Sequence, residues 1–249
     1  MVIALIPARG GSKSIPRKKL QVVGGKPLIV HSIEVARLCP VVDRTFVSTD
    51  DTEIADVSRE AGAEVIPRPS CLADDWTTDH PVFLHALAML DAAEHFRPEI
   101  VIHLRPTHPA REMGVLENAV HMLRRHPEAD SLRSVSVAAQ TPYKMWRVTD
   151  EGLLLPITDL PDVAEPFNQP RQRLPIIYWQ DGYVDVTRWK TIMELGSMTG
   201  RSILPFFNYE GSEALADDVY PRGCALGRWR SVSPVLHVVP VAESASLHR

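Results

Sequence analysis

Short apolar runs alternate with stretches of helical spacing along the first half of the chain. The runs are each bounded by Pro, Asp or Gly, which is typical of β-strands, and they cover residues 2–6, 45–48, 63–66 and 99–104. The helical stretches cover residues 28–38, 52–61, 82–93 and 114–123. This alternation favours βαβ units. We therefore predict an α/β fold: a Rossmann-like, mainly parallel sheet with helices on both faces.

The pattern becomes β-rich from residue 131 onward. Strands are expected at residues 134–138, 143–148, 153–157 and 176–186. A helix at 188–195 and a strand at 202–205 should return the chain to the sheet. We predict one domain over residues 1–230, with a β-rich dimerisation arm inserted at about 131–186 and a loosely ordered tail at 231–249.

Charge and composition exclude several classes of function. The formal net charge of −4 provides no basic field for a nucleic-acid backbone. The three cysteines have no C-x-x-C spacing, so neither a disulfide framework nor a thiolate zinc site is expected. The first strand is too short for a signal peptide, and no apolar stretch approaches about 18 residues. We expect a cytoplasmic protein with no membrane role.

The loop after the first strand carries the candidate chemistry. It reads Pro7-Ala8-Arg9-Gly10-Gly11-Ser12-Lys13, and Lys18 follows shortly after. Glycines let backbone N–H groups approach a phosphate, and the basic side chains supply charge that neutralises a triphosphate. Neither the Walker A pattern nor the dinucleotide pattern G-x-G-x-x-G is present. The loop indicates an anion site at the carboxyl edge of the sheet, where α/β proteins bind ligands.

Several ordered motifs resemble the CMP-sialic acid synthetase (acylneuraminate cytidylyltransferase) family. The likeness begins with the loop just described and Gly25-Lys26-Pro27-Leu28, and it covers about residues 2–186. The later motifs follow in the family's order at residues 47–51, 53–55, 62–63, 68–69, 72–75, 85–87, 105–109 and 170–175.

The resemblance implies a CTP-dependent nucleotidyltransferase that transfers CMP to a small acidic acceptor and releases pyrophosphate. It also implies a fold of the nucleotide-diphospho-sugar transferase type and a homodimer whose arm covers the partner's acceptor site. Carried over residue by residue, catalysis falls to Arg9, Lys13 and Lys18. The nucleotide-binding residues are then Ala8, Arg9, Gly10, Gly11, Ser12, Lys13, Ser48, Asp50 and Arg68. For Asp50 and its neighbour Asp51, capping of the helix near residue 52 is an equal alternative.

Magnesium is the expected cofactor, because it neutralises pyrophosphate as it leaves. The family holds it near a C-terminal acidic motif, of which this chain retains only Glu213 and Asp217 as candidate ligands.

The acceptor motif departs from the family. Where the family reads Gln-Pro-Thr-Ser-Pro-Leu-Arg, this chain has residues 105–111 with Arg105 first and Arg111 last. Guanidinium groups pair bidentately with carboxylate or phosphonate oxygens. We therefore expect a phosphonate acid such as phosphonoformate, as in the CMP-phosphonoformate synthetase branch. The candidate acceptor contacts are Arg105, Thr107, Arg111 and Arg171, the last across the dimer interface.

Three alternatives remain open. The acceptor could be a nonulosonic (sialic-type) acid, a related fold could use another nucleotide, and a non-catalytic nucleotide-binding regulator could retain the pocket without turnover.

Overall fold

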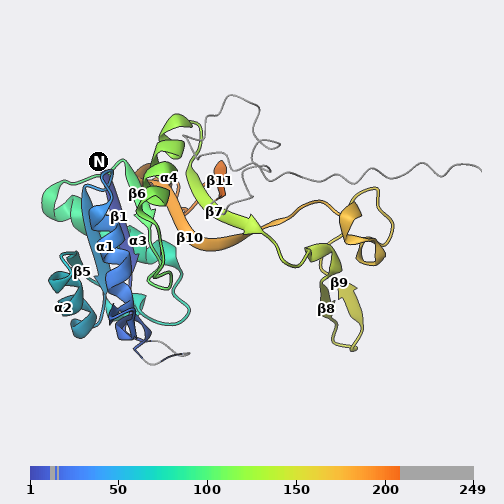
Figure 1. Cartoon of the computed structure of the whole chain (residues 1–249), viewed down its shortest axis with the longest axis horizontal. Helices are drawn as coiled ribbons and strands as arrows, with labels where there is room; N and C mark the ends of the chain where they lie inside the picture. The colour runs from blue at the N-terminus through green and yellow to red at the C-terminus, as the bar shows by residue number, and fades with distance from the viewer. Residues whose placement is uncertain (12–14, 16, 208–249) are drawn as a thin grey trace, which may run out of the picture.

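A single sheet of seven strands forms the centre of the computed structural model, which describes residues 1–11, 15 and 17–207 (Figure 1). Its order is β11-β7-β10-β6-β1-β4-β5. The strands are β1 (Val2–Pro7), β4 (Arg44–Thr49), β5 (Glu64–Pro67), β6 (Ile100–His103), β7 (Ser131–Val137), β10 (Tyr178–Arg188) and β11 (Ile203–Phe207). The helices are α1 (Leu28–Leu38), α2 (Thr52–Glu60), α3 (Asp79–Glu94), α4 (Met113–Arg125) and α5 (Trp189–Met193).

Only β10 runs against the other strands of this sheet. It pairs antiparallel with β6 on one side and with β7 on the other, whereas β1, β4, β5 and β6 are parallel neighbours. β11, the last described strand, pairs parallel with β7 and forms one edge of the sheet. This confirms the mainly parallel sheet and the return of the chain to it.

Each face of the sheet is covered by helices because alternate strand residues point to opposite sides. Ala4 and Ile6 of β1 pack with α1 and α4 on one face. Ile3 and Leu5 of the same strand pack with α3 and α5 on the other. The strands are apolar on both faces, as expected of a parallel sheet buried between two layers.

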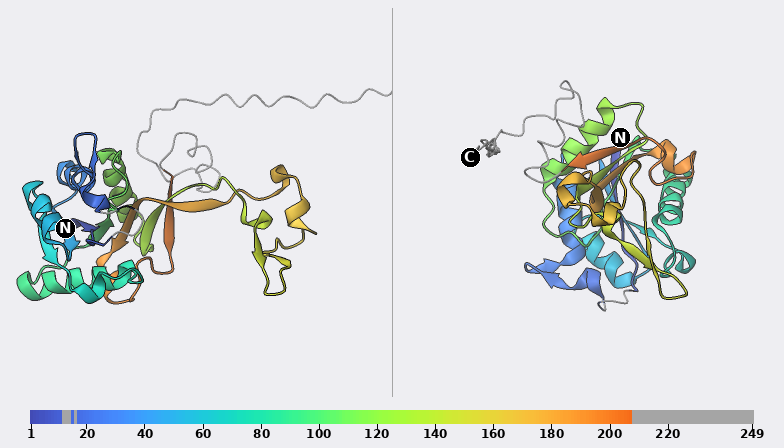
Figure 2. Two further views of the ribbon diagram at one scale, coloured as in Figure 1. Left: turned by 90° about the horizontal axis from the view of Figure 1, so that it is seen from below. Right: turned by 90° about the vertical axis from the view of Figure 1, so that its right-hand side faces the viewer.

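A long arm leaves the sheet between β7 and β10 (Figures 1 and 2). It contains the hairpin of β8 (Trp146–Val148) and β9 (Leu154–Pro156) and several 3-10 turns. The arm was predicted at residues 131–186, but β7 and the second half of β10 lie within the main sheet, so the projecting part lies between them. Large apolar side chains of the arm are exposed, Leu154 by 62% and Trp179 by 57%.

Within the described part of the chain, no helix combines the length and apolarity needed to cross a membrane.

Candidate active site

A cleft of about 290 Å³ opens at the carboxyl edge of the sheet. Its lining comes from loops that follow β1, β5 and β6, and from the first turn of α3. The charged residues in this lining are Arg9, Lys19, Arg68, Asp74, Asp75, Asp79 and Arg105. The predicted nucleotide and acceptor regions therefore share one cleft, at the edge where parallel sheets bind ligands.

The loop after β1 is held against the loop after β4. Gly10 donates its backbone N–H to Asp50 Oδ1 at 2.9 Å, and Ala8 N donates to Ser48 O at 2.9 Å. A Cβ at Gly10 would lie 2.7 Å from a carboxylate oxygen of Asp51, so this close approach requires glycine. A Cβ at Gly11 would meet no described residue within 4 Å. Gly10 thus fixes the loop, while Gly11 stays open toward solvent.

Asp50 and Asp51 both have structural partners. The Asp51 side chain accepts from Ile54 N at 2.9 Å and so caps α2. Asp50 holds Gly10, as described above, and capping and loop closure together account for this pair of carboxylates. Nucleotide contact by Asp50 stays a prediction.

Arg68 is buried and is tied to the end of β4. Its Nη2 donates to Ser48 O at 2.7 Å and its Nε donates to Ser48 Oγ at 3.2 Å. Burial lowers the pKa of the Arg68 guanidinium, while Asp50 and Asp79 oppose that shift. A buried cation with two fixed donors is a rigid element of the nucleotide end of the cleft.

Lys19 belongs to the site although the sequence analysis assigned it no role. It lies in a 3-10 turn (η1, Lys18–Leu20), and its Nζ donates to Arg9 O at 2.8 Å. Burial, with repulsion from Arg9 and Arg68, lowers the pKa of Lys19 to about 8. Arg9 itself forms an ion pair with Asp75 at 2.6 Å. These cations converge on the space that an anion would fill.

Several predicted site residues cannot be placed. Ser12, Lys13, Glu213 and Asp217 lie outside the described residues. Lys18 is half-buried, but it is not among the residues that line the cleft. Within residues 1–11, 15 and 17–207, no group of three or more His, Cys, Asp or Glu residues is arranged to hold a metal ion.

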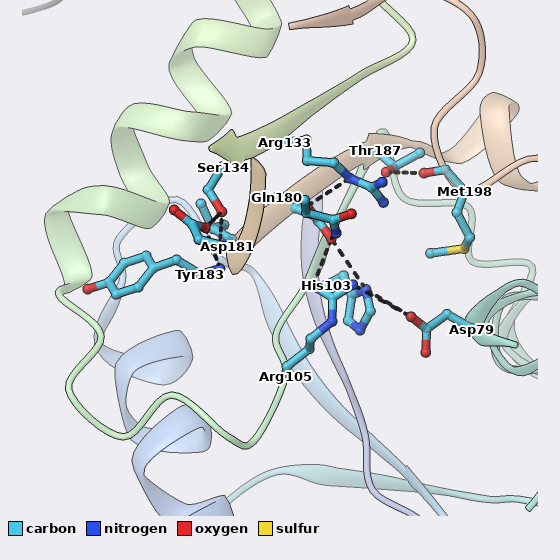
Figure 3. Close-up of polar contacts among 12 residues, drawn as sticks. Asp79, His103, Arg105, Arg133, Ser134, Gln180, Asp181, Tyr183, Thr187 and Met198 are labelled. Carbon is cyan, nitrogen blue, oxygen red and sulfur yellow. Dashed lines mark hydrogen bonds and ion pairs between the residues drawn. The ribbon is translucent and has the colours of Figure 1, made fainter. Parts of the chain in front are cut away.

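At the acceptor end, Arg105 is paired on two sides (Figure 3). Its Nη1 donates to Asp185 Oδ2 at 2.8 Å, and its Nη2 lies 3.6 Å from Asp79 Oδ2. Asp185 is only 5% exposed in its side chain and also accepts from Arg133 Nε at 3.1 Å. A bulge in β10 between Gln180 and Asp185 lets Gln180 donate to the same carboxylate at 3.3 Å.

His103 ends β6 beneath this network and is almost fully buried. Its Nδ1 lies 3.9 Å from Asp79 and 4.0 Å from Asp185, and its Nε2 has no hydrogen-bond partner among the described residues. Burial, followed by repulsion from Arg105 and Arg133, lowers the pKa of His103 well below its ordinary value. The imidazole is therefore neutral and adds no charge to the cleft.

Arg111 has a setting different from the acceptor contact that we expected. It is buried, and its donors reach Tyr183 O at 2.7 Å, Ser32 Oγ at 3.1 Å and Arg105 O at 3.2 Å. Burial lowers the pKa of Arg111 to about 10. These hydrogen bonds hold the loop after β6 against α1 and β10. In this structure the guanidinium of Arg111 therefore has a structural role. Acceptor contact by Arg111 stays a prediction, and of the two arginines only Arg105 is among the described residues that line the cleft.

The other two acceptor candidates, Thr107 and Arg171, lie in different parts of the structure. Thr107 is exposed and lines the cleft beside Arg105. Arg171 lies in the arm, exposed, with Nη2 donating to Ala138 O at 3.3 Å, and it is not part of the lining of its own chain's cleft.

Asp185 could have been singled out from the sequence, because a carboxylate between Val184 and Val186 is unusual in a buried strand. Asp79 offered no such signal. It stands among polar residues, and only the fold brings it to Arg105.

Comparisons with known proteins identify the family of the chain. The family model described as cytidylyltransferase matches residues 3–151. A CMP-N,N'-diacetyllegionaminic acid synthase from Legionella pneumophila is 29% identical over 222 residues, covering 87% of this chain and 90% of that protein. An N-acylneuraminate cytidylyltransferase from Streptococcus agalactiae is 26% identical over 223 residues. That match covers 88% of this chain but only 50% of the longer relative.

The fold has solved counterparts. The structure of a CMP:2-keto-3-deoxy-manno-octonic acid synthetase complexed with CTP aligns with a TM-score of 0.59 at 18% identity, covering 88% of this chain and 96% of that one. At this identity the likeness establishes the fold alone, the Rossmann-like nucleotide-sugar transferase type. The family match, which spans more than half of the chain, adds the activity. The chain belongs to the cytidylyltransferase family of CTP-dependent nucleotidyltransferases.

Proposed function

We propose that this enzyme transfers CMP from CTP to a sugar acid that carries one carboxylate, with release of pyrophosphate. The observation that carries the proposal is the division of the cleft. One end gathers Arg9, Lys19 and Arg68, while at the other end Arg105 is the one guanidinium that the described residues contribute to the lining. Relatives named as a CMP-N,N'-diacetyllegionaminic acid synthase and an N-acylneuraminate cytidylyltransferase support an acceptor of this class.

Nucleotidyl transfer requires the protein mainly to position CTP and the acceptor and to stabilise the negative charge that develops. A hydroxyl oxygen of the acceptor attacks the α-phosphorus, the bond from that phosphorus to the β-phosphate oxygen breaks, and the hydroxyl proton passes to solvent. Negative charge grows on the departing pyrophosphate. Arg9, Lys19 and Arg68 lie where they can neutralise it, and Gly10 and Gly11 let the loop approach the phosphates. Lys13 and Lys18 remain proposed phosphate contacts.

As far as the described residues go, the cleft suits magnesium that is held mainly by the substrate phosphates. Asp74 accepts from Trp76 N and Thr77 N at 2.7 Å, and Asp75 pairs with Arg9, so the carboxylates of the lining already have partners. Mg²⁺ commonly binds through one or two carboxylates, waters and substrate phosphates, and when bound it would neutralise the pyrophosphate oxygens. Glu213 and Asp217 remain its proposed protein ligands.

A phosphonate acid is the second candidate acceptor. The guanidinium of Arg105 faces the cleft and would suit a phosphonate. Against it, Asp185 and Asp79 already balance much of the positive charge, and Arg111 is buried elsewhere. Because the residues around Arg105 balance its charge, the site favours an acceptor with one negative charge and many hydroxyls over a small acceptor with several negative charges.

We further propose a homodimer in which the arm covers the partner's cleft. Trp179 and Leu154 expose large apolar areas on an arm that no part of its own described chain covers. Arg171 would then reach an acceptor across the interface.

The test is pyrophosphate release from CTP, ATP, GTP and UTP with Mg²⁺, each paired with N-acetylneuraminate, N,N'-diacetyllegionaminate, phosphonoformate or no acceptor. We expect release with CTP and a sugar acid only. Release with phosphonoformate alone would replace the sugar-acid proposal with the phosphonate one. CTP binding without release under any condition would identify a regulator.

A further inference from the structure

The acceptor end of the cleft is electrically balanced by residues of the protein itself. Arg105 and Arg133 supply two positive charges, and Asp79 and Asp185 supply two negative charges. His103, whose Nδ1 lies 3.9 Å from Asp79 and 4.0 Å from Asp185, is neutral because burial lowers its pKa. An acceptor therefore meets no net charge from this cluster, although Arg105 is cationic.

The carboxylates of Asp185 and Asp79 hold Arg105 in different ways. Asp185 is buried, accepts a 2.8 Å hydrogen bond from Nη1 and is itself fixed by Arg133 and Gln180. Asp79 is 46% exposed and stands 3.6 Å from Nη2, beyond hydrogen-bond length. Among the described residues, no hydrogen bond from Arg105 Nη2 or Nε is formed. Asp185 is thus a fixed anchor, and Asp79 is a loose counter-ion on the side of the cleft.

The negative charge of Asp79 is stabilised by a second interaction besides the one with Arg105. Asp79 lies in the first turn of α3, a helix of 16 residues, where a carboxylate is stabilised by the helix dipole. An acceptor carboxylate that approaches Nη2 can therefore displace Asp79 without leaving that side chain in an unfavourable position. An acceptor with a second anionic group is disfavoured, because the negative charges of Asp79 and Asp185 stay within a few ångströms of Arg105 and repel that group.

We infer that Asp79 and Asp185 are specificity-determining residues: Asp185 fixes Arg105, and Asp79 competes for its cleft-facing side, so the site admits one carboxylate and discriminates against a second anionic group. This deepens the proposed function and rests on the acceptor binding at Arg105. It also explains how an arginine can occupy this position without creating a site for multiple anions.

The test compares Asp79→Asn with the unchanged protein on an acid with one carboxylate, N-acetylneuraminate, and one with an added phosphonate, phosphonoformate. Asp56→Asn is the matched control, since it removes the same charge from an exposed position of α2 paired only with Arg59. Both acids are followed by pyrophosphate release, and by calorimetric binding in the presence of a non-hydrolysable CTP analogue. We expect Asp79→Asn to shift the preference toward phosphonoformate about tenfold or more, since it removes the carboxylate that competes for Nη2 of Arg105 and leaves that charge to a second anionic group. Asp56→Asn should leave the preference unchanged.

A double-mutant cycle assigns the effect to Arg105. In an Arg105→Gln background, Asp79→Asn should no longer shift the preference. An equal change for both acids, or a shift that persists without Arg105, would overturn the inference. If neither acid is turned over but the binding preference shifts as expected, the proposed function fails and the specificity assignment stands.

Discussion

Replacing Lys19 by Met should stabilise the protein while weakening nucleotide binding. Burial and two neighbouring arginines lower the pKa of Lys19 from its ordinary value of 10.5 to about 8. At about 1.4 kcal/mol per pH unit, this shift sets an upper limit of about 3 kcal/mol on the cost of keeping the side chain charged at pH 7, and solvent screening of a half-buried group lowers that cost to about 2 kcal/mol. The hydrogen bond from Nζ to Arg9 O offsets about 1 kcal/mol of that cost. We therefore expect Lys19→Met to raise the free energy of unfolding at pH 7 by about 1 kcal/mol.

The sign of the pH dependence follows from the lowered pKa. Between pH 8 and 10.5 the unfolded chain keeps the Lys19 proton that the folded chain has released, so this residue makes stability rise with pH across that interval. The advantage of Lys19→Met should therefore shrink as the pH rises from 7 to 9.5. Urea unfolding at both pH values measures it, and calorimetry should show CTP binding weakened about tenfold or more.

Lys18→Met is the matched control, because Lys18 occupies the same 3-10 turn but does not line the cleft. Its stability should change by less than about 0.5 kcal/mol at either pH. A Lys19→Met protein that is less stable than the unchanged protein at pH 7, or whose advantage grows with pH, would refute the reasoning.

Three further substitutions probe the nucleotide end. Gly10→Ala places a Cβ 2.7 Å from Asp51, so the loop must move, and we expect the KM for CTP to rise about tenfold in steady-state assays; an unchanged KM would count against the loop geometry. Asp51→Ala removes the cap of α2 and should lower the free energy of unfolding by about 1 kcal/mol in urea, with no loss showing that the cap is dispensable. Arg68→Met removes two hydrogen bonds to Ser48 and should weaken CTP binding about tenfold or more by calorimetry, whereas full affinity would remove Arg68 from the site.

Periodicity was enough to predict the main elements because the sheet is buried on both sides. The helix predicted at 28–38 is α1 with the same bounds, since its apolar stripe faces the core along its whole length. α3 begins at Asp79, earlier than the predicted 82, because its first turn is polar and lies at the cleft rather than in the core. β7 likewise begins at Ser131 rather than 134, since polar residues are tolerated between two paired neighbours.

The site was less predictable than the fold because its decisive contacts join distant parts of the chain. Arg105 was identified from its motif, but its counter-ions Asp79 and Asp185 come from a helix before it and a strand far after it. Without these two counter-ions, the sequence indicates that Arg105 and Arg111 are both available to an acceptor. That interpretation favoured a phosphonate acceptor. Lys19 was overlooked for a similar reason, since its burial against Arg9 and Arg68 depends on how the loop folds back.

The central claim, CMP transfer to an acidic acceptor, is tested most directly by phosphorus NMR of the protein with CTP, Mg²⁺ and N-acetylneuraminate. We predict that the CTP signals give way to pyrophosphate and a new CMP ester, and that no ester forms without the acceptor. Intact CTP throughout, in a sample shown by calorimetry to bind it, would contradict the claim.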